Sequence, residues 1–310
     1  MAVPVTAFAV LAILVFSPVC CRAWAGDMPV DRIRVDSSLV LIPVDVTTAI
    51  GTTVTDMRKE DFRVYEDNVE QRVTTFALED APVSVGVLFD ASGSMRGRMH
   101  EAAAAVRAFL GTANAADEFF LIEFSDKAKL TVPLTQDPDE IFGEVRRTKA
   151  FGRTSLLDAI HLALVELKAS RNPRKAIVIL SDGGDNRSRF SQVQVRNDVL
   201  ESDAQLYAIG IFSPDNPRKL TPEERGGPKL LDALADSSGG RLYTVKDLDE
   251  LAGIGARIGN ELRTEYVIGY NSTNPQRDGK YRHVTVKLTA SSRPAELRTS
   301  YRHGYYAPSN

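Results

Sequence analysis

Short apolar runs alternate with helical segments between Val83 and Leu262, and this order dictates most of the expected fold. The run at residues 176–180 has no polar residue, which is typical of a strand buried on both faces of a sheet. Strand patterns lie at residues 83–89, 119–124, 176–180, 205–211 and 241–244. Helical patterns lie at residues 95–110, 141–147, 155–169, 192–202, 230–235 and 248–262, with residues 214–229 expected to be irregular. The alternation predicts an α/β fold, with a doubly wound, mostly parallel sheet flanked by helices.

Residues 26–82 and 263–310 carry strand patterns and no helical period. Apolar residues at every second position of residues 40–46 predict a strand, and Pro43 inside it indicates an edge position, because proline cannot donate to a ladder. Further strands are expected at residues 62–65, 71–76, 265–270, 281–288 and 297–306. Neither flank has enough strands for a sandwich of its own. We therefore expect the flanks to pair as a discontinuous β-sandwich-like domain, with an α/β domain at residues 83–262 inserted into it.

The N-terminal segment predicts export. Residues 5–15 form an apolar run, and an Ala-Trp-Ala triplet ends at Ala25, so residues 1–25 read as a signal peptide cleaved near Ala25. The alternative is a retained membrane anchor, but the run is short of the roughly 20 apolar residues of a membrane span. We expect a periplasmic, cell-surface or secreted protein with no transmembrane segment in the mature chain. Both cysteines, Cys20 and Cys21, precede this cleavage point, which excludes disulfides and thiol chemistry from the mature chain.

Composition excludes one class of partner. The chain has 310 residues, of which 43% are hydrophobic and 25% charged, enough for a full core and about two domains. The formal net charge is −3 and the basic residues are spread along the chain. This pattern lacks the electrostatic footprint of a nucleic-acid-binding protein.

Three segments at expected strand–helix junctions carry oxygen ligands. They are Asp90-Ala-Ser92-Gly-Ser94, Thr154 before a helix, and Asp182 after the strand at residues 176–180. In an open α/β sheet, ligands gather beyond the carboxyl ends of strands. Two carboxylates at that edge repel each other unless a cation lies between them, and the three hydroxyls supply neutral oxygens. This all-oxygen set suits Mg²⁺, Ca²⁺ or Mn²⁺, which prefer hard ligands, and does not suit zinc.

Each of these residues also has a simpler explanation. Ser92, Ser94 or Thr154 could cap a helix, and Asp182-Gly183 could be an ordinary turn. Their combination, in this order at strand ends, favours a metal site.

Together these segments resemble the von Willebrand factor A domain with its metal-ion-dependent adhesion site. That pattern is Asp-x-Ser-x-Ser, then a threonine about sixty residues on, then an aspartate in a strand-end Ser/Thr-Asp-Gly. The resemblance covers residues 83 to about 258, and it implies that the hydroxyls of Ser92 and Ser94 bind the metal. It implies direct binding by Thr154 in the ligand-competent state, and direct or water-mediated binding by Asp90 and Asp182. A Glu or Asp of a protein partner would fill the open coordination position.

Two further features accompany the resemblance. The Lys-Glu-Asp-Phe phrase at residues 59–62 is similar to the β-rich lead-in of bacterial exported proteins that contain such a domain. On loops near the expected metal edge lie Arg96, Arg153, Asp185 and Arg187, which we expect to form the rim of the partner-binding surface. The arginines would steer an acidic partner toward the site.

Two other functions compete with adhesion. A metal-dependent phosphoryl-transfer hydrolase would want a second acid two positions after Asp90, where Ser92 stands. No Gly-x-Ser-x-Gly elbow or phosphate loop is present, and the four histidines are scattered, so we expect no catalytic residues and no enzyme. The second alternative is a structural or assembly module that uses its sheet edges and carries an incidental metal.

Overall fold

The described part of the chain covers most of its length beyond the N-terminus. The computed structural model describes residues 39–48, 51–212, 221–245, 247–289 and 297–309. The predicted signal peptide at residues 1–25, with Cys20 and Cys21, lies outside the described residues. Within these ranges, no helix combines the length and apolar character that crossing a membrane requires.

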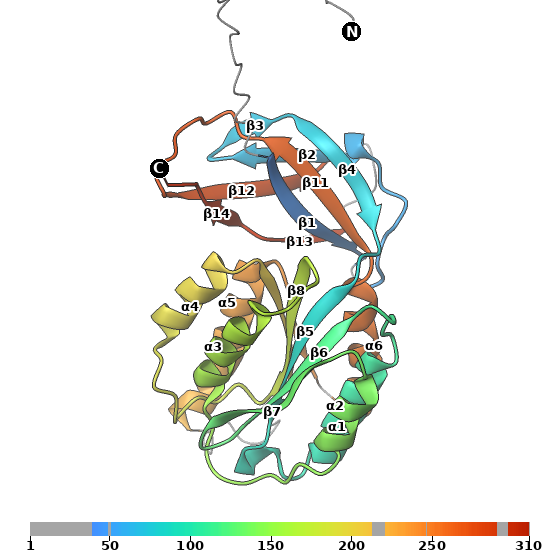
Figure 1. Ribbon diagram of the computed structural model, residues 1–310, viewed down its shortest axis with the longest axis vertical. Helices are drawn as coiled ribbons and strands as arrows, with labels where there is room; N and C mark the ends of the chain where they lie inside the picture. Colours follow the sequence, from blue (N-terminus) through green and yellow to red (C-terminus); the bar gives the residue numbers. More distant parts are fainter. Residues whose placement is uncertain (1–38, 49–50, 213–220, 246, 290–296, 310) are drawn as a thin grey trace, which may run out of the picture. The chain divides into compact units, whose positions relative to one another are not determined.

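A six-stranded sheet forms the α/β part (Figure 1). Its strand order is β10-β9-β8-β5-β6-β7. All neighbouring strands are parallel except β6 and β7. The strand order runs outward from β5 in both directions, so the boundary of β5 with β8 is the topological switch point, where such sheets bind ligands. The strands are β5 (Val83–Asp90), β6 (Glu118–Phe124), β7 (Ala128–Thr135), β8 (Arg174–Ser181), β9 (Ala204–Gly210) and β10 (Leu242–Thr244).

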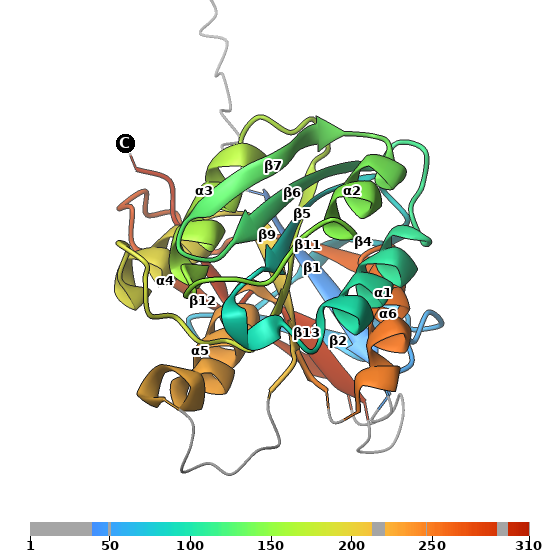
Figure 2. The same ribbon diagram turned by 90° about the horizontal axis from the view of Figure 1, so that it is seen from below.

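Helices cover both faces of this sheet (Figure 2). One face carries α1 (Met99–Leu110), α2 (Pro138–Val145) and α6 (Leu251–Glu261). The other carries α3 (Leu156–Leu167), α4 (Gln192–Glu201) and α5 (Pro222–Ser238). In β8, Val178 and Leu180 join the apolar cluster of the first face, whereas Ile177 and Ile179 join that of the second. The unbroken apolar run therefore reflects burial on both sides, and the predicted α/β fold is confirmed.

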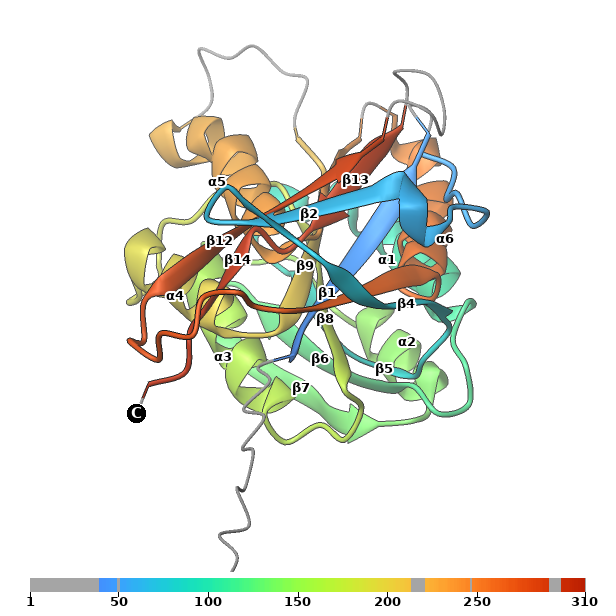
Figure 3. The ribbon, with the colours of Figure 1, turned by 90° about the horizontal axis from the view of Figure 1, so that it is seen from above.

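The flanking strands form two four-stranded antiparallel sheets, in the orders β13-β1-β11-β4 and β14-β12-β2-β3. Each sheet combines strands from both flanks, blue and red in Figure 3, as expected. We call this part the β-frame. Its strands are β1 (Leu39–Thr47), β2 (Phe62–Glu66), β3 (Val69–Gln71), β4 (Val73–Glu79), β11 (Glu265–Asn271), β12 (Tyr281–Leu288), β13 (Arg298–Tyr301) and β14 (Gly304–Tyr306). A shared apolar cluster, which includes Ile42, Phe62 and Ile268, fills the space between them.

The strand that contains Pro43 is not an edge strand, because β1 lies between β13 and β11. The register with β13 begins only at Val44, so Pro43 faces a strand partner on one side alone, at Val267. The missing N–H of proline is thus tolerated at the point where pairing with β13 starts.

The strand predicted at residues 71–76 is in fact two strands, β3 and β4, which belong to different sheets. The expected turn before it is present, with Asp67 and Asn68 at φ 46° and 69°, as a tight hairpin requires. The strand predicted at residues 297–306 is likewise divided into β13 and β14, in different sheets. Switching between sheets leaves little trace in a pattern of apolar alternation.

Two elements lie where the sequence predicted an irregular segment or no element at all. The edge strand β7 was not predicted, and α5 begins at Pro222 rather than at residue 230. A reciprocal capping box explains this start: the Glu224 amide donates to the Thr221 hydroxyl at 3.2 Å, and the Thr221 amide donates to the Glu224 carboxylate at 2.7 Å. The cap and the burial of Leu231 outweigh the poor helix propensity of the glycines and proline within the helix.

The β-frame meets the α/β part at the edge where the parallel strands begin. Arg174, the first residue of β8, forms a 2.5 Å ion pair with Glu265, the first residue of β11. Arg263 forms a second ion pair with Asp117, just before β6. The described residues all belong to one compact unit. The carboxyl ends of the strands therefore lie at the opposite edge of the sheet, away from these contacts.

Candidate metal centre

Asp90 ends β5 at the carboxyl edge of the sheet and is fully buried. Its Oδ1 accepts a 2.8 Å hydrogen bond from the Ser92 amide, and its Oδ2 accepts a 2.5 Å bond from the Ser181 hydroxyl. The Ser92 and Ser94 hydroxyl oxygens lie 3.0 Å apart. Ser92 precedes a short 3₁₀ helix, Gly93–Met95, but its side chain makes no capping hydrogen bond. Helix capping therefore does not account for the Ser92 hydroxyl.

The segment that contains Thr154 is tied to this loop through the backbone. The Gly93 amide donates to the Gly152 carbonyl at 3.0 Å, and the Phe151 amide donates to the Ala91 carbonyl at 2.8 Å. Thr154 itself is buried, with 4% of its surface exposed, and the N-cap position of α3 belongs to Ser155. The predicted hydroxyl ligand is thus brought beside the first loop rather than used as a cap.

Asp182 follows directly on β8, which is the sheet neighbour of β5. Asp182 is 7% exposed, and one of its carboxylate oxygens accepts the Gly184 amide at 3.3 Å. Gly183 has φ +78° and touches helix α5: a Cβ placed there would lie 2.9 Å from backbone atoms of Gly227. The loop is therefore held both by its own hydrogen bond to Asp182 and by its close contact with α5.

The environment of Asp90 disfavours its charged form. Burial, followed by the negative charge of Asp182, raises the pKa of Asp90 to about 7, although hydrogen bonds from Ser181 and Ser92 lower it. Among the described residues, no group of three or more His, Cys, Asp or Glu side chains is placed to hold a metal. A cation at this edge would therefore rely on hydroxyls beside the two carboxylates, a donor set that fits a hard divalent ion.

The four predicted rim residues differ from one another in exposure and in hydrogen bonding. Arg96, Arg153 and Arg187 are exposed on the loops around the site. Asp185 is half-buried, and its carboxylate accepts a 2.6 Å hydrogen bond from the Ser188 hydroxyl. Burial raises the pKa of Asp185, and hydrogen bonds from Ser188 and from the first backbone amides of α3 partly offset this. Asp185 is thus engaged in ordering the loop.

Four residues outside the predicted ligand and rim sets support the site. Ser181 joins Asp90 to the Asp182 loop, since its hydroxyl also accepts the Gly183 amide at 2.9 Å. The Asn186 side chain accepts the Thr154 amide at 3.1 Å, and Asp126 accepts the Arg153 amide at 3.0 Å. Ser155 is fully buried, and its hydroxyl has no hydrogen-bond partner within the described ranges, which is costly unless a bound group satisfies it. Ser181 carried a signal as a small polar residue at the end of an apolar strand, and Asn186 carried one by its place just past Asp182.

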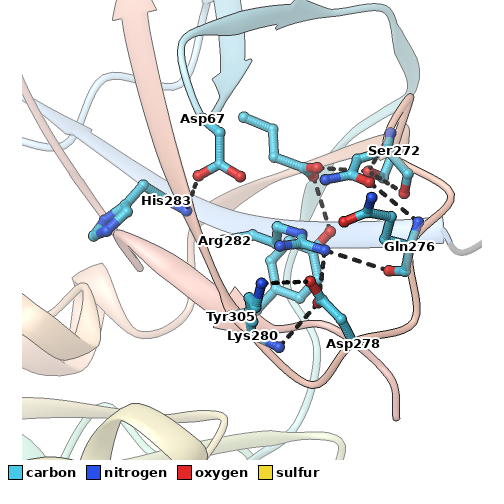
Figure 4. Close-up of polar contacts among 10 residues, drawn as sticks. Asp67, Ser272, Gln276, Asp278, Lys280, Arg282, His283 and Tyr305 are labelled. Carbon is cyan, nitrogen blue, oxygen red and sulfur yellow. Dashed lines mark hydrogen bonds and ion pairs between the residues drawn. The ribbon is translucent and has the colours of Figure 1, made fainter. Parts of the chain in front are cut away.

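A second polar cluster lies in the β-frame and belongs to its architecture. Arg282 donates to Asp278 at 2.8 Å and to the Gln276 carbonyl at 3.3 Å, which fastens the loop before β12 (Figure 4). Nearby, the buried Glu66 carboxylate accepts hydroxyl hydrogen bonds. The donors are Tyr270 at 2.9 Å, Ser272 at 2.6 Å and Tyr305 at 2.8 Å. This carboxylate is satisfied, so the cluster reads as a structural network.

Comparison with known families agrees with this geometry. Residues 85–185 match the model of the von Willebrand factor type A domain. The chain carries a von Willebrand factor type A (VWA) domain. The matched range contains all five residues of the predicted metal set, from Asp90 to Asp182.

Solved structures share the fold at low sequence identity. A von Willebrand factor type A protein from Catenulispora acidiphila aligns with a TM-score of 0.51 and 14% identity, covering 89% of this chain and 75% of that one. Proximal thread matrix protein 1 from the mussel byssus aligns with a TM-score of 0.51 and 18% identity, covering 64% and 51%. At such identities these likenesses show the fold alone.

A relative in sequence is an uncharacterized protein of Borreliella burgdorferi, 29% identical over 150 residues. The alignment covers 42% of this chain and 42% of that protein, so the chain spans less than half of the relative's length.

Proposed function

We propose that the VWA domain is a metal-dependent protein-binding module of the adhesion type. A divalent cation, Mg²⁺ in the first instance with Ca²⁺ or Mn²⁺ as alternatives, would be held by Asp90, Ser92, Ser94, Thr154 and Asp182. A Glu or Asp carboxylate of a partner protein would complete its coordination. Because the domain supplies only two carboxylates, the bound ion would keep much of its attraction for a further anionic ligand.

The observation that carries this proposal is the convergence of three separate segments at the switch point of the sheet. The Ser92 and Ser94 hydroxyls lie 3.0 Å apart, and two backbone hydrogen bonds hold the Thr154 segment against their loop. Ser181 links Asp90 to the loop of Asp182. Such supporting contacts orient ligands in metal sites.

Binding is favoured over hydrolysis by what stands next to Asp90. The second position after it is Ser92, whose amide is hydrogen-bonded back to Asp90 at 2.8 Å, so no second acid is available there to move a proton. Asp185, the next carboxylate along the third segment, is engaged with Ser188. We therefore assign no catalytic residue.

A capture experiment with the full chain tests the proposal. Immobilised wild-type protein, Asp90→Ala and Thr154→Ala would be incubated with extract of the source cells in Mg²⁺ or in EDTA. Ser170→Ala serves as a control, because its hydroxyl donates to the Leu167 carbonyl at the far end of α3. We expect partners on the wild type and the control in Mg²⁺ alone. Equal capture under all conditions would instead indicate an assembly module with an incidental metal.

We also propose that the protein is exported, on the basis of the apolar run at residues 5–15 and the Ala-Trp-Ala triplet that ends at Ala25. N-terminal sequencing of the protein from fractionated source cells should find Gly26 first, outside the cytoplasm. A cytoplasmic protein that retains residues 1–25 would contradict export.

A further inference from the structure

A groove of about 650 Å³ lies directly beside residues 90–94, the loop proposed to hold the metal, which we call the metal loop. We call this groove the Phe151 groove. Its lining includes Ala91, Lys127, Lys129, Arg147, Lys149 and Phe151. Ala91 lies between Asp90 and Ser92, and its carbonyl accepts the Phe151 amide at 2.8 Å. The groove therefore begins at the metal loop itself, and the position of Phe151 is fixed relative to the predicted cation.

Phe151 exposes a large apolar side chain at this edge. It is 57% exposed, and among the described residues of the VWA domain the other large exposed hydrophobic residues are the aliphatic Val165 and Val193. A protruding aromatic ring on a backbone held by hydrogen bonds is the kind of anchor that protein interfaces use, since it buries much area at little entropic cost. It would contact an apolar side chain of whatever occupies the groove.

The groove lining has four basic and three acidic residues, so its formal charge is positive by one. Lys127, Lys129 and Lys149 are exposed and form no ion pair within the described residues. The acidic residues of the lining, in contrast, are engaged. Glu144 pairs with Arg147 at 2.7 Å, Glu123 accepts the Thr148 hydroxyl, and Asp126 accepts the Arg153 amide. Only Glu144 is offset by an ion pair, so the three lysines exceed the remaining two carboxylates by one charge and favour an anionic ligand.

A second groove shares Asp126, Lys127 and Ala128 with the first and also contains Arg187, so charge alone does not distinguish the two grooves. Its volume is about 840 Å³, and it is lined by Asp158, His161, Arg189 and Phe190 among others. There Asp158 pairs with Arg189 at 3.2 Å, while His161 contacts Asp198 at 2.8 Å and stacks on Phe190 at 3.9 Å. Phe190 is thus already covered by His161, whereas Phe151 is 57% exposed and its groove includes Ala91 of the Asp90–Ser94 loop, so the Phe151 groove is the better docking surface.

We infer that the occupant of the Phe151 groove is an acidic peptide segment of the partner, with an apolar side chain close to its metal-binding carboxylate. One carboxylate completes the metal coordination, the apolar side chain packs on Phe151, and neighbouring acidic residues face Lys127, Lys129 and Lys149. This inference rests on the proposed function, and it adds the chemistry of the segment that the domain recognises.

Selection from a random peptide library displayed on phage tests the inference. The full chain would be the bait in Mg²⁺, with EDTA as the eluent. Parallel selections would use Phe151→Ser, the double variant Lys127→Glu and Lys149→Glu, and the controls Val165→Ser and Lys168→Glu. Both controls change exposed residues near the end of α3, roughly 15 Å or more along the helix axis from Thr154.

We expect the wild type and the controls to select acidic peptides with an apolar residue near a Glu or Asp. Phe151→Ser should lose the apolar preference, and the lysine variant should lose the acidic one. Each variant should bind the dominant wild-type peptide about tenfold more weakly. If all baits selected the same sequences and EDTA still eluted them, the Phe151 groove would not be the docking surface. The proposed metal-dependent function would still stand. Peptides that resist EDTA and also bind Asp90→Ala, or no EDTA-eluted peptide at all, would overturn the proposed function itself.

Discussion

Ser181 donates a 2.5 Å hydrogen bond from its hydroxyl to the carboxylate of Asp90, across the boundary between β8 and β5. The same oxygen accepts the Gly183 amide at 2.9 Å. A small side chain outside the predicted ligand set thus links both aspartate-bearing loops. These bonds fix the Asp90 carboxylate and the start of the Asp182 loop, and such preorganisation would lower the cost of ordering them around a cation.

Replacing Ser181 with alanine should weaken Mg²⁺ binding more than it affects folding. We expect Mg²⁺ affinity to fall about 10- to 100-fold, as for other supporting residues of metal sites. The free energy of unfolding should fall by about 1–3 kcal/mol, because the buried Asp90 oxygen loses its donor. Calorimetric titration and urea denaturation measure the two effects. Unchanged Mg²⁺ affinity would show that Ser181 has no part in orienting the site.

Two adjacent glycines of α5 should respond in opposite ways to alanine. A Cβ on Gly227 would lie 2.6 Å from backbone atoms of Gly183, whereas a Cβ on Gly226 meets nothing within 4 Å. Gly227→Ala should destabilise the fold by about 1–3 kcal/mol through overpacking and should also weaken Mg²⁺ binding, because it displaces the Asp182 loop. Gly226→Ala should be neutral or stabilise by up to about 1 kcal/mol, since alanine is the better helix former. Equal unfolding midpoints for the two variants would refute this close contact.

A buried acidic cluster joins the β-frame to the α/β part. Tyr207 of β9 donates a 2.7 Å hydrogen bond to Asp45 of β1. Arg241 reaches Glu261 of α6 at 3.8 Å and Ser300 of β13 at 2.8 Å. Burial, then the charges of Glu265 and Glu261, raise the pKa of Asp45 well above its ordinary value, although the Tyr207 hydrogen bond and Arg241 lower it.

Stability should therefore fall with rising pH at this junction. The folded chain holds the Asp45 proton to higher pH than the unfolded chain, so the stabilisation is complete below the ordinary pKa of 3.8 and is lost as pH rises toward the folded value. For one proton the slope is at most about 1.4 kcal/mol per pH unit. Asp45→Asn, which keeps an acceptor for Tyr207, should flatten the decline between pH 5 and 8. Denaturant titrations across that range measure it, and parallel wild-type and variant curves would contradict the assignment.

The sequence predicted the α/β fold because its strands are buried on two faces and so carry long apolar runs, as in residues 176–180. It predicted that Asp90, Thr154 and Asp182 would lie at one edge, because parallel strands place their carboxyl ends together. It also predicted that the two flanks pair, because neither flank has enough strands for a sandwich of its own.

Other features depend on contacts that leave little local pattern. The position of β1 in its sheet depends on where β13 ends, and Pro43 alone pointed the wrong way. The start of α5 was hidden by its glycines and proline, although Thr221 and Glu224 have the spacing of a capping box. Asp126 and Asn186 act through single hydrogen bonds to backbone amides of the Thr154 segment. Such bonds are visible only once distant segments are placed side by side.

Calorimetric titration of Mg²⁺ into the metal-free full chain tests the central claim most directly. The account predicts one ion bound per wild-type chain, the same for Ser170→Ala, and no binding at this site in Asp90→Ala, with a strong loss in Thr154→Ala. Absence of binding by the wild type, or equal binding by wild type and Asp90→Ala, would contradict a metal centre on the Asp90–Ser94 loop.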